Sequence, residues 1–212
     1  MSKLKLLIMI GLALILLAVL ETKAADLSSV QVTGVTYQGS GCPQGSVQTA
    51  FSPNLSQFSI LYDSFVMDVG GKTLETTDTK GCEVLINLHL PFGYAINVDS
   101  ADFRGFISLD GGVVAQHTVD HRINSNKLAS YGFGTQIFVG PKQENYLIKS
   151  QRPNIQLPKV LQCLPLKQDV TLMVRTHIKM TGGEGARLGL MTVDSADGKI
   201  EQRYALSLKK CL

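Results

Sequence analysis

Two histidines have the type and spacing that could bind a metal ion. His117 and His121 are four residues apart, so a helix would place both imidazoles on one face. Apolar residues of the same parity surround them: Val113, Ala115, Val119 and Ile123. This alternation predicts a strand, in which positions i and i+4 lie about 13 Å apart, too far to share one ion. We therefore expect two packed or rim histidines rather than a metal pair.

Paired aspartates are the second candidates for metal chemistry. Asp194 and Asp197 precede Gly198, and Asp99 and Asp102 form a similar pair. Carboxylate oxygens in a tight turn suit calcium, although neither pair has the spacing of an EF-hand loop. The alternative is a turn in which aspartate caps the backbone and glycine takes a positive φ. No cofactor is assigned with certainty, and calcium is the one that these residues would suit.

Basic side chains provide weak candidates for ligand binding. Arg175, His177 and Lys179 alternate along one predicted strand, so they share a face that could hold an acidic glycan or a phosphate surface. The alternative is a solvated strand face. Arg104 lies between two phenylalanines and could stack against a ligand or pair with Asp102 in a salt bridge.

The sequence gives even less support to a catalytic site than to a ligand-binding one. A serine hydrolase elbow of the form GxSxG is missing from the sequence. Glycosidase chemistry needs two carboxylates about 5–10 Å apart, and the sequence does not fix the separation of Glu83 and Glu201. The glycine-rich residues 39–45 lack the GK[ST] of a phosphate-binding loop. We assign no catalytic residue. Asn54 begins a glycosylation sequon that matters only in a eukaryotic source.

The N-terminus predicts export. Lys3 and Lys5 precede an apolar run of 15 residues, 6–20, and small residues suit cleavage after Ala24. As a helix this run would span about 22 Å, short of the ~30 Å hydrocarbon core of a bilayer, which favours a signal peptide over a membrane anchor. We expect a signal peptide at 1–24 and a single domain at 25–212, secreted to an extracellular or periplasmic space. No later run is long enough to span a membrane.

The net charge and the cysteine count limit further which class of protein this is. The 212 residues carry 20 Lys and Arg against 17 Asp and Glu, and the part after residue 24 is nearly neutral, which argues against a bulk nucleic-acid binder. Four cysteines in an exported chain predict two disulfides, for which three pairings are open. We favour the pairing of neighbours, Cys42–Cys82 and Cys163–Cys211. A zinc site is disfavoured because the sequence has no CxxC.

Alternation with period two dominates the rest of the chain and predicts half-buried strands. Representative runs are Phe58, Ile60 and Tyr62; Val84, Ile86 and Leu88; and Val170, Leu172 and Val174. The parity slips at Gly34, which predicts a β-bulge. Ten or more short strands separated by Gly, Pro and Asp turns predict an all-β, two-sheet antiparallel sandwich of jelly-roll type. Residues 149–168 hold three prolines and are expected to form a long connection.

Several motifs resemble the secreted family called domain of unknown function 4360. They are residues 39–47 (GSGCPQGSV), 102–106 (DFRGF), 109–113 (LDGGV), 194–198 (DSADG) and 204–208 (YALSL). The resemblance covers most of residues 34–211 and implies a small secreted β-rich protein of bacteria or fungi with no established activity. The family often has Trp at the position of Leu208, whereas this chain has no Trp.

Three functions remain open from the sequence. The first is a non-enzymatic binding module for glycan or cell-envelope surfaces, in which Tyr37, Tyr131 and Tyr146 would replace the tryptophans that usually stack on sugars. The second is a structural or interaction protein of the extracellular layer, with another extracellular protein as partner. The third is a hydrolase on a jelly-roll scaffold, which would need clustered carboxylates with one raised pKa.

Overall fold

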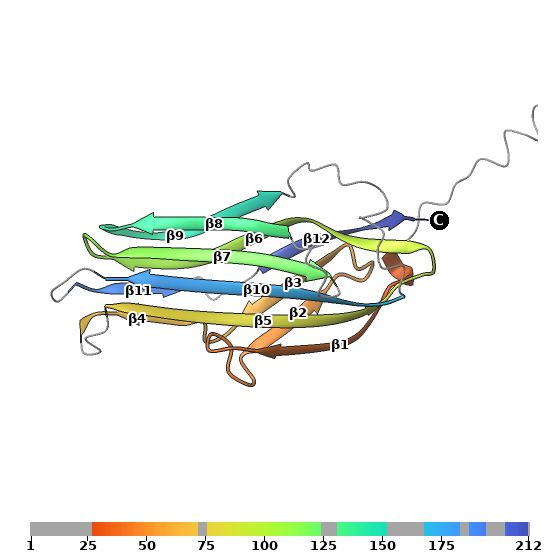
Figure 1. Cartoon of the computed structure of the whole chain (residues 1–212), viewed down its shortest axis with the longest axis horizontal. Helices are drawn as coiled ribbons and strands as arrows, with labels where there is room; N and C mark the ends of the chain where they lie inside the picture. Colours follow the sequence, from red (N-terminus) through yellow and green to blue (C-terminus); the bar gives the residue numbers. More distant parts are fainter. Residues whose placement is uncertain are drawn as a thin grey trace, which may run out of the picture.

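A computed structural model describes residues 27–71, 76–123, 131–151, 168–182, 187–193 and 202–211. Twelve β-strands and one short 3₁₀ turn, η1 (Leu27–Ser29), account for the regular structure of these ranges. The strands form two antiparallel sheets, so the predicted all-β, two-sheet class is confirmed (Figure 1). The predicted signal peptide at 1–24 lies outside the described residues.

The five-stranded sheet combines strands from well-separated parts of the chain. Its strands in spatial order are β1 (Gln31–Gln38), β5 (Thr77–His89), β10 (Asp169–Thr181), β7 (Val114–Ile123) and β8 (Tyr131–Val139). All neighbours are antiparallel. The register shifts between Val32 and Gly34, which confirms the bulge predicted at that point.

The seven-stranded sheet is organised around one long strand. Its path is β2 (Val47–Phe51), β3 (Gln57–Tyr62), β12 (Gln202–Lys210), β6 (Tyr94–Leu109), β11 (Gly189–Thr192) and β4 (Val66–Val69), with β9 (Lys142–Gln151) also paired to β6. One edge of β6 pairs with β9, and the other edge pairs first with β12 and then with β11. The strand order does not confirm the expected jelly-roll connectivity. Strand β9 also extends to Gln151, into the stretch that we predicted to be a connection.

The core lies between the two sheets and follows the predicted alternation. Residues 84, 86 and 88 of β5 are all buried, and so are residues 170, 172 and 174 of β10. One cluster of buried apolar side chains extends through both sheets. This burial of one face per strand is what the period of two requires.

The core also contains a polar group of four residues. Gln202 is fully buried, and its Oε1 accepts hydrogen bonds from the hydroxyls of Tyr204 at 2.8 Å, Thr176 at 3.2 Å and Tyr62 at 3.4 Å. Burial raises the pKa of both tyrosines above the ordinary range, so the hydroxyls remain protonated donors. The two sheets are thus connected by hydrogen bonds as well as by apolar contact.

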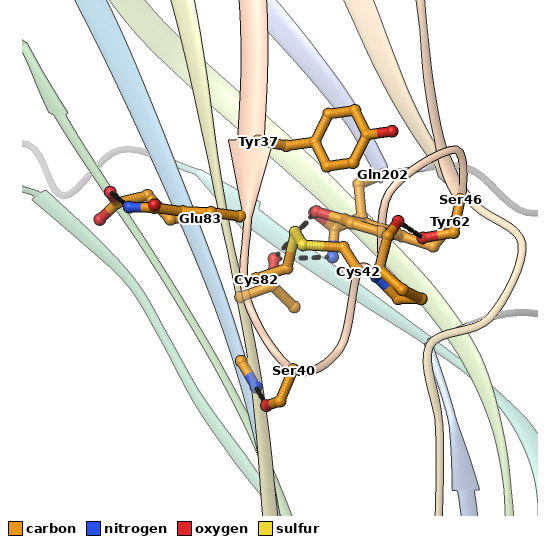
Figure 2. The surroundings of a disulfide bond; sticks show 12 residues. Tyr37, Ser40, Cys42, Ser46, Tyr62, Cys82, Glu83 and Gln202 are labelled. Atoms are coloured by element: carbon orange, nitrogen blue, oxygen red, sulfur yellow. Dashed lines mark hydrogen bonds between the residues drawn. A yellow bond between two sulfur atoms is a disulfide. The ribbon is translucent and has the colours of Figure 1, made fainter.

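The disulfide Cys42–Cys82 is confirmed, with a sequence separation of 40. It attaches the loop after β1 to β5, and Figure 2 shows Glu83 on one side of the sheet and Tyr62 and Gln202 on the other. None of the cysteines in the described ranges is a free thiol. Cys163 lies outside the described residues, so the pairing Cys163–Cys211 stays a prediction.

Candidate binding groove beside the disulfide

A groove of about 630 Å³ lies on the outer face of the five-stranded sheet, where β1, β5 and β10 are neighbours. Its walls combine a backbone-rich loop with polar side chains: Gln38, Gly39, Ser40, Thr79, Gly81, Cys82, Glu83, Arg175 and His177. The Cys42–Cys82 disulfide holds the loop against the sheet, and Cys82 is one of the lining residues. A volume of this size is in the usual range for small-molecule sites.

A row of three polar side chains crosses the groove. Gln38, Glu83 and Arg175 are register partners on adjacent strands. The Gln38 amide Nε2 donates to Glu83 Oε1 at 3.2 Å, and Arg175 Nε donates to Glu83 Oε2 at 2.6 Å. The hydrogen bond from Arg175 is the main reason why the pKa of Glu83 lies below its ordinary value. Both carboxylate oxygens are therefore fixed, and the carboxylate is ionised at neutral pH.

Arg175, which lines the groove, has further donors. Among the described residues, the terminal nitrogens Nη1 and Nη2 of Arg175 make no hydrogen bond. An arginine carries five N–H donors, so four are available to a ligand. His177 is exposed, and its ring lies over Gly81, where an added Cβ would be only 2.7 Å from Nδ1. Because Gly81 has no side chain, the His177 imidazole can lie directly over it in the groove.

Hydrogen bonds donated by three backbone N–H groups fix the loop that closes the groove. Gly41 N donates to Gly81 O at 2.9 Å, and Gly81 N donates to Ser40 Oγ at 3.2 Å. Gly45 N donates to the Tyr37 hydroxyl at 2.6 Å, which ties the far side of the loop to β1. The glycine-rich residues 39–45 thus form a wall that the disulfide and these hydrogen bonds hold in one conformation in the absence of a ligand.

The predicted basic stripe is only partly in this groove. Arg175, His177 and Lys179 do share the outward face of β10, as the alternation indicated. Arg175 and His177 line the groove, whereas Lys179 is not among its lining residues. Sequence reasoning assigned no ligand role to Gln38 or Glu83. The available signal was the predicted disulfide, because linking residues 42 and 82 places the end of β1 beside Glu83.

Asp102 and Arg104 lie in the other sheet, so the structure does not bring them to the groove. Both are on the outward side of β6, and Asp102 is the register partner of Lys149 on β9 and Arg203 on β12. No ion pair joins Asp102 to Arg104 within the described residues. Asp102 is therefore placed to interact across strands, with cations on both neighbouring strands.

The structure places Asp99 and Asp102 in a strand and not in a turn, and a calcium site at these residues stays a prediction. Both residues lie inside β6, and the register shift between Ala205 and Leu206 makes Asp99 the extra residue of a β-bulge. Asp194 and Asp197 lie outside the described residues. Within the ranges that the structure covers, no three His, Cys, Asp or Glu side chains gather as a metal site.

The two histidines are packed on a strand, as expected. His117 and His121 both lie in β7, and each is about 1% exposed. Tyr37 and Tyr146, two of the three tyrosines considered for sugar stacking, do not present an exposed platform. Tyr146 is only 7% exposed, Tyr37 is half-buried with its hydroxyl used by the loop, and the side chain of Tyr131 lies outside the description.

Relatives of this chain agree with export. An uncharacterized secreted protein from Arthroderma benhamiae (strain ATCC MYA-4681 / CBS 112371) is 26% identical over 189 residues, covering 89% of this chain and 74% of that protein. The helices that the structure describes include none long and apolar enough to cross a membrane.

Solved structures resemble the chain only remotely. A carbohydrate-binding module specific for non-crystalline cellulose, CBM28, has a TM-score of 0.33 at 11% identity and covers 75% of this chain and 83% of its own. A family 11 carbohydrate-binding module from Clostridium thermocellum, in complex with a β-1,3-1,4-mixed-linked tetrasaccharide, has a TM-score of 0.22 at 12% identity, covering 82% and 90%. Likeness at this level carries no argument about the groove. A family model does match residues 28–211, and the chain therefore belongs to the family described as domain of unknown function (DUF4360).

Proposed function

We propose that the protein is a secreted, non-catalytic binding module that holds a neutral glycan in the groove beside the Cys42–Cys82 disulfide. The observation that carries this proposal is the row Gln38–Glu83–Arg175, in which a carboxylate is held by an amide and a guanidinium. Planar polar groups fixed in this way can exchange hydrogen bonds with vicinal hydroxyls, because they offer donors and acceptors side by side.

The charge of the groove favours an uncharged ligand. Glu83 and Arg175 form an ion pair at 2.6 Å, so their charges offset each other where a ligand would lie. A strongly acidic ligand would compete with Glu83 for Arg175. A basic ligand would be repelled by the positive charge of Arg175. A neutral polyhydroxylated chain would neither compete with Glu83 nor be repelled by Arg175. The described residues that line the groove include no Phe, Tyr or Trp on which a sugar ring could stack. Hydrogen bonds would therefore supply most of the selectivity.

The state of Glu83 bears on the hydrolase alternative. A general acid needs a raised pKa so that it is protonated at neutral pH. The pKa of Glu83 is instead lowered, chiefly by the Arg175 hydrogen bond. Glu83 thus suits a hydrogen-bond acceptor in a binding site. Glu201, the other carboxylate considered from the sequence, lies outside the described residues.

A second candidate, an interaction protein of the extracellular layer, is supported by one surface. Val114 of β7 and Ile137 and Val139 of the edge strand β8 point outward and are 37%, 56% and 61% exposed. Exposed apolar side chains grouped on a sheet edge are typical of protein contacts. Concentration-dependent self-association of the mature chain would favour this function.

The test uses residues 25–212 produced under oxidising conditions and a panel of neutral and acidic glycans and envelope fractions. We expect saturable binding to a neutral glycan, unaffected by chelator, and at least a tenfold loss in Arg175→Met. Asp169→Asn is the matched control, because Asp169 pairs with His89 at 2.7 Å between the same two strands, away from the groove. Equal binding by Arg175→Met and the control, or no binding to any member of the panel, would refute the groove as a glycan site.

A further inference from the structure

The turn between β2 and β3 holds a sequence motif that the proposed binding function does not use. Residues 54–56 (Asn-Leu-Ser) are the one sequon of the type N-x-[ST] in the 212 residues. The turn joins Phe51, the last residue of β2, to Gln57, the first residue of β3. Phe51 and Phe58 are register partners whose stacked rings have centroids 6.0 Å apart. The motif therefore lies at the end of an anchored hairpin.

Hydrogen bonds within the turn orient the side-chain amide of Asn54. Ser56 donates twice to Asn54 Oδ1, from its backbone N at 3.2 Å and from its hydroxyl at 2.8 Å, and the Ser52 hydroxyl lies 3.0 Å from the same oxygen. A backbone N–H can only donate, so the amide atom that it faces is the carbonyl oxygen and not the nitrogen. The amide nitrogen Nδ2 makes no hydrogen bond with any described residue. Nδ2 is therefore the atom of this side chain that can be modified without breaking the turn.

The residue in the middle of the motif sets which side of the turn faces the core. Leu55 has a φ of 52°, in the left-handed region that residues other than glycine uncommonly adopt. Its backbone N donates to Ser52 O at 2.8 Å, and its side chain packs against the core. Asn54 is exposed. A large group on the Asn54 side chain would therefore extend into solvent, while Leu55 keeps the turn attached to the protein.

We propose that Asn54 carries an N-linked oligosaccharide, attached by the oligosaccharyltransferase of a eukaryotic secretory pathway. The donor is an oligosaccharide on a lipid pyrophosphate. The bond between the first sugar carbon and the pyrophosphate oxygen breaks, a bond from that carbon to Asn54 Nδ2 forms, and Nδ2 gives up one proton as the lipid pyrophosphate leaves. The product keeps Oδ1 as an acceptor, so both hydrogen bonds from Ser56 remain possible in the glycosylated protein.

This site is separate from the groove beside the disulfide. Strands β2 and β3 belong to the seven-stranded sheet, whereas the groove is on the five-stranded sheet. The loop that closes the groove precedes Val47, and Asn54 follows Phe51, so the whole of β2 lies between them. The five residues of β2 span roughly 15 Å. The oligosaccharide on Asn54 is thus a covalent modification and not the ligand of the groove, and the proposal does not rest on the function of the groove.

The test is to secrete residues 25–212 from a eukaryotic host and to treat the product with peptide N-glycosidase, which removes an N-linked oligosaccharide and leaves aspartate in place of the asparagine. We expect a mass above that of the polypeptide before treatment, and an aspartate at position 54 after it. Asn145 is the internal control, because it is exposed on β9 but has Leu147 in place of the required hydroxyl residue, and it should be unmodified. Secreted protein without a glycan on Asn54 would overturn the proposal.

Three variants make the test specific. Ser56→Thr keeps the hydroxyl and should keep the glycan, whereas Ser56→Ala should lose it. Asn54→Asp has the same covalent structure as the treated wild type, so the two should have equal mass and equal unfolding temperature, which shows that the variant is folded. Loss of the glycan in Ser56→Thr, or its persistence in Ser56→Ala, would contradict the proposal. Arg175→Met should carry the same glycan as the wild type, so a failure of binding in the groove and a failure of glycosylation are told apart.

Discussion

Tyr146 of β9 lies across Gly105 of β6, its register partner, and reaches the centre of the sandwich only because that residue has no side chain. A Cβ at position 105 would overlap both the Tyr146 hydroxyl and the carbonyl oxygen of Thr192. Glycine inside a strand weakens the strand, and its presence there often marks a close approach. Here the close approach lets Tyr146 connect β9, β11 and His117.

The first prediction concerns this glycine. Gly105→Ala should lower the free energy of unfolding by about 3 kcal/mol, because the added methyl forces Tyr146 out of its place between the sheets. Gly111→Ala is the matched control, since the nearest atom to its added Cβ is Pro141 Cδ at 3.8 Å, an ordinary contact. Urea unfolding measures both. A Gly105→Ala midpoint equal to that of the control would show that the Tyr146 position is not constrained.

The predictable part of the fold is the part governed by local alternation. Residues such as Ile86 and Leu172 were assigned to the core because apolar side chains of one parity need one buried face. The same alternation rule assigns polar residues to the solvent-exposed face, which is wrong for some of them. Gln202 is fully buried in the core, and no alternation of apolar residues singles it out. Tyr146, considered from the sequence as a replacement for a sugar-stacking tryptophan, is buried as well.

The candidate site depended on contacts between distant segments, which a single sequence does not reveal. Glu83 and Arg175 are 92 positions apart, and only the pairing of β5 with β10 brings them together. The strand position of Asp99 and Asp102 could not be predicted for a different reason. Asp99 is a polar residue in a short polar stretch, which is typical of a turn, but here it is accommodated by a bulge in a strand of 16 residues. Bulges and turns share the same residue types.

The second prediction concerns the buried polar group in the core. Gln202→Leu should destabilise the fold by about 2–4 kcal/mol, because the hydroxyls of Tyr62, Thr176 and Tyr204 would lose their shared acceptor in a buried site. The control is Gln38→Leu, the same substitution at an exposed strand position, with an expected cost of roughly 1 kcal/mol or less. A Gln202→Leu protein as stable as the control would mean that the hydroxyls find other partners.

The third prediction is a pH dependence of stability. The pKa of His117 is about 3 in the folded state because of burial, against about 6.5 in the unfolded chain. Between these values the unfolded chain binds a proton that the folded protein does not. The contribution of His117 is therefore complete above about pH 6.5 and falls as the pH decreases, by up to about 1.4 kcal/mol per pH unit.

His117→Phe should remove this slope while keeping an aromatic ring beside Phe103 and Tyr146. Urea unfolding at several pH values between 7 and 4 measures the difference between the wild-type and variant curves. His177→Phe, at an exposed position, controls for the introduction of a phenylalanine. Parallel curves for His117→Phe and the wild type would show that His117 becomes protonated in the folded state.

The last prediction concerns the disulfide that braces the groove. It closes a loop of 40 residues, for which the chain-entropy model gives a stabilisation of about 4 kcal/mol. The double variant Cys42→Ala, Cys82→Ala should unfold at a correspondingly lower urea concentration. It should also bind glycan more weakly under conditions where it remains folded, because the loop that carries Ser40 loses its covalent attachment to β5.

Non-reducing peptide mapping of the wild type provides the covalent check, with a Cys42–Cys82 link expected from the structure and a Cys163–Cys211 link from the sequence. The hydrogen bonds that join the Gly41 backbone and the Ser40 hydroxyl to Gly81 remain in the double variant, so they limit how far the loop can detach. Undiminished glycan affinity together with lowered stability would assign the disulfide to stability alone. Undiminished stability would contradict the loop-closure argument, because the unfolded chain would then gain nothing from losing the link.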